Sequence, residues 1–250
     1  MKSKQDWSKY GEMDPYYGVL SDNKYKKDNL TESGFSEFFE TGNQYVRETQ
    51  SRIYQQYADS IAEMDILDFG CGVGRLAIPF AQNTVKKVVG LDVSPGMISI
   101  AQAKQKQLEL NNLQYVSYSG ENIPNIGPFD LVNSYIVIQH IEPEFGYPLI
   151  EQLCEQAKVG GYVHLQIPYG HQLPLISYLK FYLKVNNDFY NKFSNWAKGE
   201  GFQRTPVMQM NYYKQEKLEE IFSKYTDKVH KEPTDHGGHL GNFYYFKRTK

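Results

Sequence analysis

The chain has 250 residues, 22% of them charged, and its formal net charge is -2 at pH 7. This length fits one hydrophobic core with embellishments, and the near-neutral balance provides no positive excess that would attract nucleic acid. Two cysteines are too few for a disulfide framework, and the sequence shows neither a signal peptide nor a run of about twenty apolar residues. We therefore expect a single cytoplasmic domain over residues 1–250, with no membrane span and no nucleic-acid partner.

The first 41 residues are expected to form an N-terminal arm, which either docks on the rest of the domain or closes over its ligand. Residues 1–34 mix Lys, Asp, Gly and Tyr without sustained periodicity, which predicts an ordered arm rather than a regular element. Trp7 and Tyr10 in this arm need a surface to pack against. From residue 42 onward one helix face recurs at every fourth position and leads into the first strand: Tyr45, Thr49, Ile53, Tyr57 and Ile61.

A strand, a glycine loop and a helix are predicted from residue 64 onward. Residues 66–69 indicate a short buried strand, after which closely spaced glycines turn the backbone sharply and leave room for a ligand. These glycines are Gly70, Gly72 and Gly74. The next strand, at residues 88–92, is apolar until it ends in Asp92, as a nucleotide-binding βαβ unit requires for holding a ribose diol.

Two positions indicate which type of nucleotide is bound. A dinucleotide fingerprint requires a third glycine at position 75, where this chain has Arg75. Asp68, directly before the first glycine, would attract an ammonium group and repel a pyrophosphate. The sequence therefore favours a cationic amino-acid nucleotide over NAD.

The motifs LDFGCGVGR and LDVSPGMI resemble the first motif and the strand-two acid of the class I methyltransferases that use S-adenosylmethionine. The resemblance runs from about Ile66 to Pro168 and recurs more weakly towards the C-terminus. It implies a Rossmann-like α/β three-layer sandwich with a seven-stranded, mostly parallel sheet whose last strand is antiparallel. It also implies that S-adenosyl-L-methionine is the cofactor and that methyl transfer is the reaction.

The resemblance also assigns parts of the cofactor to residues. It places the methionine part on Asp68 and the glycine loop, and the ribose on Asp92. The motif SGENIP resembles the family's adenine-contacting motif, although Ser119 stands where that motif usually has an acid. The predicted cofactor residues are Asp68, Gly70, Cys71, Gly72, Gly74, Arg75, Asp92, Val93, Ser94, Met97, Ser119, Gly120, Glu121, Asn122, Ser134 and Tyr135.

The cofactor-binding core is expected to span residues 42–168, in which strands and helices alternate five times. Ser94 is a predicted N-cap and Pro95 the first residue of a helix. Other helices are predicted at residues 76–82 and 149–158, and strands at 113–118, 129–138 and 159–168. Such alternation implies a parallel sheet that binds ligands beyond the carboxyl ends of its strands. Those ends are predicted at Asp68, Asp92, Ser119, Ser134 and Tyr169.

The segment from 169 to 212 is longer than a usual connection between strands. It predicts two short helices rich in Leu, Tyr, Phe and Trp directly after a strand end, which we interpret as a lid or a wall of the substrate pocket. A surface for dimerisation or for a membrane is the alternative, because exposed apolar helices often mediate association. Residues 213–250 predict a helix at 214–224 and strands at 228–232 and 242–248, resembling the end of the methyltransferase sheet.

The inferred reaction passes a methyl group in line to a nucleophilic acceptor, so the protein must align the acceptor, exclude water and accept any proton that leaves. Histidine suits the last task, and His140 and His171 follow the fourth and fifth predicted strands. Tyr169 and Tyr135 are placed to orient an acceptor through their hydroxyls. Cys71 is expected to serve as a small loop residue, because nothing near it in sequence would activate a thiolate.

Asp235, His236 and His239 raise the question of a metal site. Glycines on both sides make this segment a flexible loop rather than a preformed pair of ligands. We therefore predict no metal site here, and expect a hydrogen-bonded loop or a part of the acceptor pocket.

The sequence as a whole predicts methyl transfer to an oxygen or nitrogen of a small molecule, such as a natural product or a sugar-like metabolite. Two alternatives remain open, namely an NAD-dependent oxidoreductase and a non-catalytic protein of the same fold that binds the nucleotide. Methylation of a protein or RNA is a third, and it predicts a basic surface groove. Oligomers that form through residues 170–212 are compatible with each of these functions.

Overall fold

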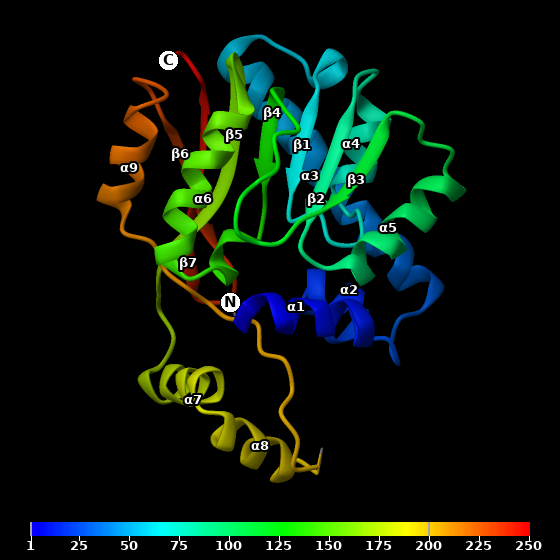
Figure 1. Cartoon of the computed structure of the whole chain (residues 1–250), viewed down its shortest axis with the longest axis vertical. Helices are drawn as coiled ribbons and strands as arrows, with labels where there is room; N and C mark the ends of the chain where they lie inside the picture. Colours follow the sequence, from blue (N-terminus) through cyan, green and yellow to red (C-terminus); the bar gives the residue numbers. More distant parts are fainter. Residues whose placement is uncertain (1, 200) are drawn as a thin grey trace.

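The structure, a computed structural model that describes residues 2–199 and 201–250, is built around one seven-stranded sheet (Figure 1). The strands lie in the order β3-β2-β1-β4-β5-β7-β6. The first five are parallel, and β7 is antiparallel to both β5 and β6, which confirms the predicted fold class. The strands are β1 (Ile66–Phe69), β2 (Val88–Asp92), β3 (Leu113–Ser117), β4 (Phe129–Ser134), β5 (Ala157–His171), β6 (His230–Asp235) and β7 (His239–Lys247).

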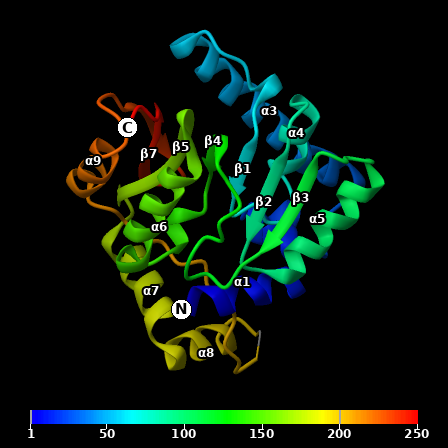
Figure 2. The same ribbon diagram turned by 45° about the horizontal axis from the view of Figure 1, so that its top comes forward.

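Helices cover both faces of this sheet (Figure 2). Leu153 of α6 and Phe222 of α9 are fully buried against one face, and Val46 of α3 and Phe80 of α4 against the other. The α-helices are α1 (Lys2–Met13), α2 (Pro15–Val19), α3 (Glu32–Tyr57), α4 (Ala77–Asn83), α5 (Pro95–Gln107), α6 (Pro143–Gln156), α7 (Leu175–Asn186), α8 (Asp188–Trp196) and α9 (Gln215–Ser223). None of the helices in the described residues is long and apolar enough to cross a membrane.

The N-terminal segment is helical, so the prediction of an arm without regular elements is wrong. Trp7 and Tyr10 of α1 pack against a buried cluster that contains Val73 of the glycine loop and Met97 of α5. These contacts with distant parts of the chain stabilise α1 and α2, whose own sequences carry no sustained apolar periodicity. The two helices lie across the carboxyl ends of the parallel strands (Figure 1).

Several boundaries differ from the predicted ones for local reasons. Helix α3 begins at Glu32 rather than at residue 42, because Thr31 caps it by accepting a hydrogen bond from the Gly34 N–H at 3.1 Å. Strand β4 ends at Ser134 rather than at residue 138, because Ile136 has a φ of +61°, which no strand can contain. The predicted start of α5 is confirmed, since the Ser94 hydroxyl accepts from the Met97 N–H at 3.4 Å.

The two helices predicted between β5 and α9 are present as α7 and α8, and they project beyond α1 (Figure 1). The chain that returns from α8 is held to it by two buried amides. The Asn191 side chain donates to the Thr205 carbonyl oxygen at 3.2 Å, and the Asn195 side chain donates to the Gln203 carbonyl oxygen at 2.8 Å. Buried amides with such partners fix the position of a helix.

The returning chain is also joined to the N-terminal helix. Arg204 donates through both Nη atoms to the two carboxylate oxygens of Asp6, at 2.6 and 2.9 Å, and through Nε to Asp188 at 3.2 Å. Asp6 is only 2% exposed, so solvent screens this bidentate pair little. One arginine thus connects α1, α8 and the returning chain.

Substitution of Arg204 by glutamine is expected to release α1 from the returning chain, because a buried carboxylate that loses its partner costs about 3–5 kcal/mol. Hydrogen exchange of the α1 amides measures this release. The control is Asp188→Asn, which removes the exposed partner of Arg204 and leaves the pair with Asp6 intact. Equal protection of α1 in Arg204→Gln and in the unaltered protein would show that the ion pair does not hold the helix.

Candidate functional site

A pocket lies at the carboxyl ends of β1, β2 and β4, between these strand ends and helices α1 and α2. It contains about 910 Å³ of space, including its open mouth. Asp68 and Asp92 line it from the strand ends, Trp7 and Val19 from the N-terminal helices, and His140 from the turn after β4. Open α/β sheets bind their ligands at this edge.

The glycine loop forms one wall of the pocket with bare backbone. Gly70 has a φ of +74°, and a Cβ atom there would lie 2.3 Å from the Val137 side chain. Gly72 has a φ of +53°, and its N–H donates to the Asp92 carboxylate at 2.9 Å. Both positions therefore require glycine, and a ligand can approach the main chain closely.

Asp68 presents a buried carboxylate with one oxygen unpartnered. Its Oδ1 accepts from the Asn133 amide at 3.0 Å, and the Asn133 carbonyl oxygen in turn accepts from the Tyr45 hydroxyl at 2.7 Å. Its Oδ2 is buried without a hydrogen-bond partner in the described residues. Burial raises the pKa of Asp68 to about 7, although the Asn133 hydrogen bond and the Arg75 charge oppose this change. The free oxygen is suited to a cationic group.

Asp92 differs from Asp68 because both of its oxygens are bonded to backbone. One accepts from the Gly72 N–H at 2.9 Å and the other from the Ser94 N–H at 2.8 Å. Burial raises the pKa of this carboxyl, and the backbone hydrogen bonds oppose the shift. Each oxygen keeps a lone pair for a further donor, so the carboxylate is held ready to accept from hydroxyl groups.

Arg75 takes the position where a dinucleotide fingerprint would have a glycine. It is 4% exposed, and its guanidinium lies 5.4 Å from the centre of the Tyr135 ring. One Nη atom donates to the Thr41 hydroxyl at 3.3 Å. The guanidinium thereby connects the glycine loop to α3 and to the chain after β4.

His140 offers the pocket a neutral ring with one accepting nitrogen. Its Nδ1 lies 2.6 Å from the Gln209 carbonyl oxygen, which can only accept, so Nδ1 carries the proton. Its Nε2 is 3.4 Å from the amide nitrogen of Gln139. Burial lowers the pKa of His140 to about 4, so the ring is uncharged at pH 7. The Trp7 ring lies 4.8 Å away, between centres.

Comparison with known proteins identifies the core. Residues 66–161 match the family described as a methyltransferase domain. The match covers 96 of the 250 residues, and over this stretch the chain is similar to methyltransferase domains. The fold of the whole chain agrees, since the crystal structure of magnesium protoporphyrin IX methyltransferase from Synechocystis PCC 6803 with bound SAH covers 97% of this chain and 98% of its own, with a TM-score of 0.61 at 18% identity.

Curated relatives of the methyltransferase domain are more similar in sequence but match shorter stretches. Demethylmenaquinone methyltransferase of Oceanobacillus iheyensis is 28% identical over 50% of this chain and 51% of its own length. The mitochondrial ubiquinone biosynthesis O-methyltransferase of Dictyostelium discoideum is 30% identical over 41% of this chain and 34% of its own length. The match thus spans about half of the first relative and a third of the second.

Most of the predicted cofactor residues lie together in the wall of the methyltransferase pocket. These are Asp68, Gly70, Cys71, Gly72, Arg75, Asp92, Val93, Met97, Gly120 and Tyr135. The others lie outside the wall, either buried behind it or exposed in the loop after β3, and their contacts with a cofactor stay predictions. These are Gly74, Ser94, Ser119, Glu121, Asn122 and Ser134.

The three candidate catalytic residues lie in different places. His140 lines the pocket, whereas His171 and Tyr169 do not. The His171 ring stacks on Tyr178 of α7 at 4.2 Å between centres, with an angle of 18° between the planes. The structure therefore favours His140 as the residue to test first, and the roles of all three stay predictions.

The Asp235–His239 loop is hydrogen-bonded. Asp235 accepts from the Gly238 N–H at 2.6 Å, and the His239 Nδ1 lies 2.7 Å from the Tyr212 hydroxyl oxygen. Within residues 2–199 and 201–250, no group of three or more His, Cys, Asp or Glu side chains is arranged to hold a metal ion.

Several wall residues of the methyltransferase pocket were missed by sequence reasoning. They come from α2, from the ends of strands, from the start of α4 and from the chain after β4: Gly18, Val19, Phe69, Leu76, Tyr118, Ile136, Val137 and Ile141. Ile136 has a φ of +61°, a strained conformation for a β-branched residue that is typical of ligand sites. The local sequence carries no signal for this conformation. Tyr118, by contrast, directly precedes the SGENIP motif, so this motif could have indicated Tyr118 as a residue of the site.

Proposed function

We propose that the protein transfers the methyl group of S-adenosylmethionine to an oxygen or nitrogen of a small-molecule acceptor. The observation that carries this proposal is the free carboxylate oxygen of Asp68, buried at the start of the glycine loop. Asn133, the Arg75 charge and the Ala77 backbone N–H compensate the burial of this carboxylate only in part, since its pKa is still raised to about 7, and a ligand with an ammonium group beside a nucleoside would compensate it further. NAD offers no such ammonium group, so this oxygen argues against the oxidoreductase alternative.

The residues present fit S-adenosylmethionine. Asp68 would take the ammonium group of its methionine part, and the Gly70–Gly72 backbone would pack against that part. Asp92 would accept hydrogen bonds from the ribose hydroxyls. Met97 and Tyr118 also line the pocket and would provide apolar surface for adenine.

The chain's own groups would align the reactants and remove one proton. The cofactor supplies an electrophilic methyl group, whose bond to sulfur breaks as its bond to the acceptor forms. Trp7, Val19 and Ile141 would exclude water from this place, which favours loss of the positive charge on the sulfonium as its methyl group is transferred. The Nε2 atom of His140 would accept the proton that the acceptor oxygen or nitrogen loses.

The acceptor class is inferred from the names of similar proteins and from the lining of the pocket. The relatives named above are called methyltransferases of demethylmenaquinone and of ubiquinone biosynthesis, and the structural neighbour is called a methyltransferase of magnesium protoporphyrin IX. Each of these names refers to a small molecule. We infer a small-molecule acceptor here too, in agreement with the apolar wall of the pocket.

Calorimetry with S-adenosylmethionine, S-adenosylhomocysteine and NADH tests the cofactor. We expect binding of the first two and none of NADH, and the reverse result would establish the oxidoreductase alternative. Incubation with methyl-labelled cofactor and separated metabolite, protein and RNA fractions then tests the acceptor. Label in the metabolite fraction supports the proposal, label in protein or RNA contradicts it, and binding without any transfer indicates a non-catalytic protein.

The affinity for S-adenosylhomocysteine is expected to rise about eightfold between pH 6.0 and pH 7.5. Because the pKa of Asp68 in the free protein is raised to about 7, its carboxyl is protonated below that pH and attracts the ligand's ammonium group only above it. At higher pH, where the ligand's own amino group loses its proton, the affinity should fall again. Calorimetry across this range measures the profile, which should be flat on the acid side in Asp68→Asn.

A further inference from the structure

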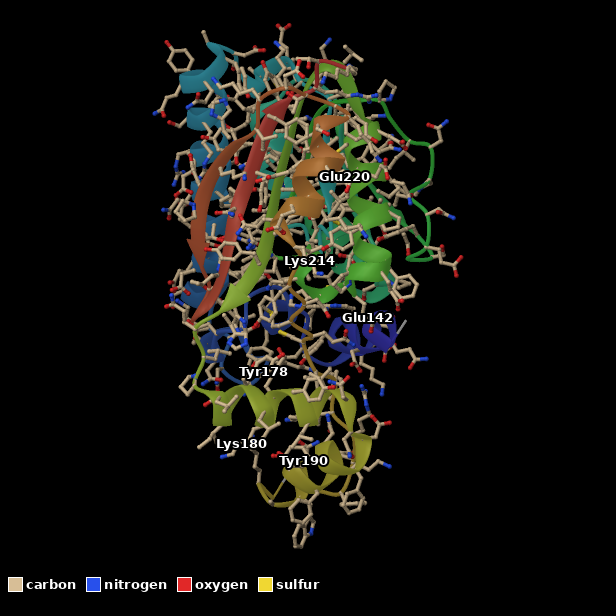
Figure 3. The ribbon with its side chains drawn as sticks, turned by 90° about the vertical axis from the view of Figure 1, so that its left-hand side faces the viewer. Glu142, Tyr178, Lys180, Tyr190, Lys214 and Glu220 are labelled. Carbon is tan, nitrogen blue, oxygen red and sulfur yellow. The ribbon has the colours of Figure 1, made fainter. Side chains whose placement is uncertain are left out.

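Helices α7 and α8 present an apolar surface to solvent at the end of the molecule that holds the pocket (Figure 3). Eight of the fourteen exposed large apolar side chains in the described residues belong to this surface, and their exposed fractions run from 47 to 79%. We call it the lid patch. It consists of Leu175, Ile176, Leu179, Tyr182, Phe189, Phe193, Trp196 and Phe202.

The outward orientation of the lid patch is fixed by contacts on its inner side. Tyr178 stacks on His171 at the end of β5, and in Figure 3 it lies on the side of α7 opposite to Lys180. Asn191 and Asn195 of α8 are fully buried and hydrogen-bonded to the returning chain. These contacts therefore hold the apolar side chains of the lid patch towards solvent.

The outermost part of the lid patch is a continuous aromatic cluster. The ring of Phe189 lies 6.5 Å from that of Phe193 and 6.0 Å from that of Phe202, and the ring of Phe193 lies 5.7 Å from that of Trp196. These rings contact each other while they stay about half exposed or more. Exposed clusters of this kind mark association sites.

Charge distinguishes between the possible partners. Residues 175–204 contain five basic and two acidic side chains; together with the buried Asp6 that pairs with Arg204 they carry a formal charge of +2, whereas the whole chain carries -2 and the remainder therefore -4. Lys180 and Lys198 are exposed beside the apolar side chains. Two copies joined through this face would bring two such positive segments together, which like-charge repulsion opposes. An anionic partner is favoured instead.

We propose that the lid patch docks on the surface of an anionic lipid bilayer. Aromatic and leucine side chains on one face, with lysines at its border, are the composition of segments that lie in the headgroup region of membranes. The lysines would attract anionic headgroups, and the apolar side chains would enter the boundary with the acyl chains. Docking in this way brings the pocket end of the protein towards the bilayer. This inference does not rest on methyl transfer.

Sedimentation with lipid vesicles tests the proposal, with vesicles of phosphatidylcholine alone and of phosphatidylcholine mixed with phosphatidylglycerol. We expect the full chain to bind the mixed vesicles at least about tenfold more tightly, because each basic residue near such a surface contributes about 1 kcal/mol. The triple variant Lys180→Glu, Lys192→Glu, Lys198→Glu should lose this preference. Phe189→Ser with Phe193→Ser should weaken binding to both vesicle types. Melting temperature and cofactor affinity report whether each variant is folded.

Tryptophan fluorescence gives a second readout, because the chain has only Trp7 and Trp196. Trp196 is 59% exposed, so its emission should shift to shorter wavelength with mixed vesicles, and Trp196→Phe should show no shift. Val159→Ser is the matched control, since Val159 is 68% exposed in β5, outside the lid patch. Absence of vesicle binding, equal binding to both vesicle types, or protection of Trp196 through self-association would each overturn the proposal.

Discussion

Asparagine in place of Asp68 is expected to weaken binding of S-adenosylmethionine by about a hundredfold. The ligand's ammonium group would be buried at this place, and a charged group that loses its buried partner costs about 2–5 kcal/mol, of which about 2.7 kcal/mol corresponds to a hundredfold change. Asparagine has the same shape and can still accept the hydrogen bond from Asn133. The substitution therefore removes the charge with little disturbance of the pocket, and calorimetry measures the change in affinity.

Asp65→Asn is the matched control for this experiment. Asp65 directly precedes β1, at the end opposite to the pocket, where it is partly exposed and pairs with Lys158 at 3.2 Å. The same chemical change there should leave the cofactor affinity unaltered. Equal losses in both variants would point to distortion of β1, and undiminished binding by Asp68→Asn would refute the assignment of the ammonium group to this residue.

The part of the site that the sequence predicts well is the part that one short segment builds. Asp68, Gly70 and Gly72 follow each other on the chain, and the hydrogen bond from Gly72 to Asp92 joins two successive strands of one βαβ unit. The geometry of such a unit is nearly independent of what surrounds it. The parallel arrangement of the first five strands is predicted equally well, because alternating strands and helices imply a parallel sheet.

The opposite wall of the pocket depends on contacts between distant segments, and sequence reasoning does not reach it. Trp7 packs against His140, 133 positions away, and the Gln209 carbonyl oxygen that determines the tautomer of His140 lies 69 positions further on. Neither the contact of Trp7 with His140 nor that of His140 with Gln209 is indicated by periodicity or spacing in the sequence. The helical form of α1 was missed for the same reason, since it is stabilised by packing rather than by its own pattern.

The sequence alone also does not show which of the two candidate histidines, His140 or His171, lines the pocket. Both His140 and His171 follow strands whose carboxyl ends point to the pocket edge, so the sequence treats them alike. In the structure β5 continues to His171, beyond the pocket, and its ring is occupied by stacking on Tyr178. The short β4 and the turn at Ile138–His140 instead carry His140 into the pocket wall. Strand length, which the sequence predicts poorly, thus determines which of the two histidines lines the pocket.

Alanine in place of His140 is expected to lower kcat by about a hundredfold or more, since a positioned base contributes typically 10²–10⁴ to a rate. Cofactor affinity should change little, because in the proposed binding mode Asp68 and the glycine loop hold the cofactor. The measurement is release of S-adenosylhomocysteine at saturating cofactor, with the metabolite fraction that supports turnover by the unaltered protein. With its pKa lowered to about 4, His140 stays neutral above pH 5, so this group should impose no pH dependence on kcat between pH 5 and 8.

His171→Ala is the comparison variant for the loss of kcat expected in His140→Ala. The variant removes a partly buried imidazole from the neighbouring strand, outside the pocket, and should reduce kcat only a few fold through looser packing of Tyr178. A large loss in His171→Ala with little in His140→Ala would transfer the role of base to His171. Small losses in both would mean that the acceptor needs no base from the protein. In that case alignment and exclusion of water, by residues such as Trp7, would account for the catalysis.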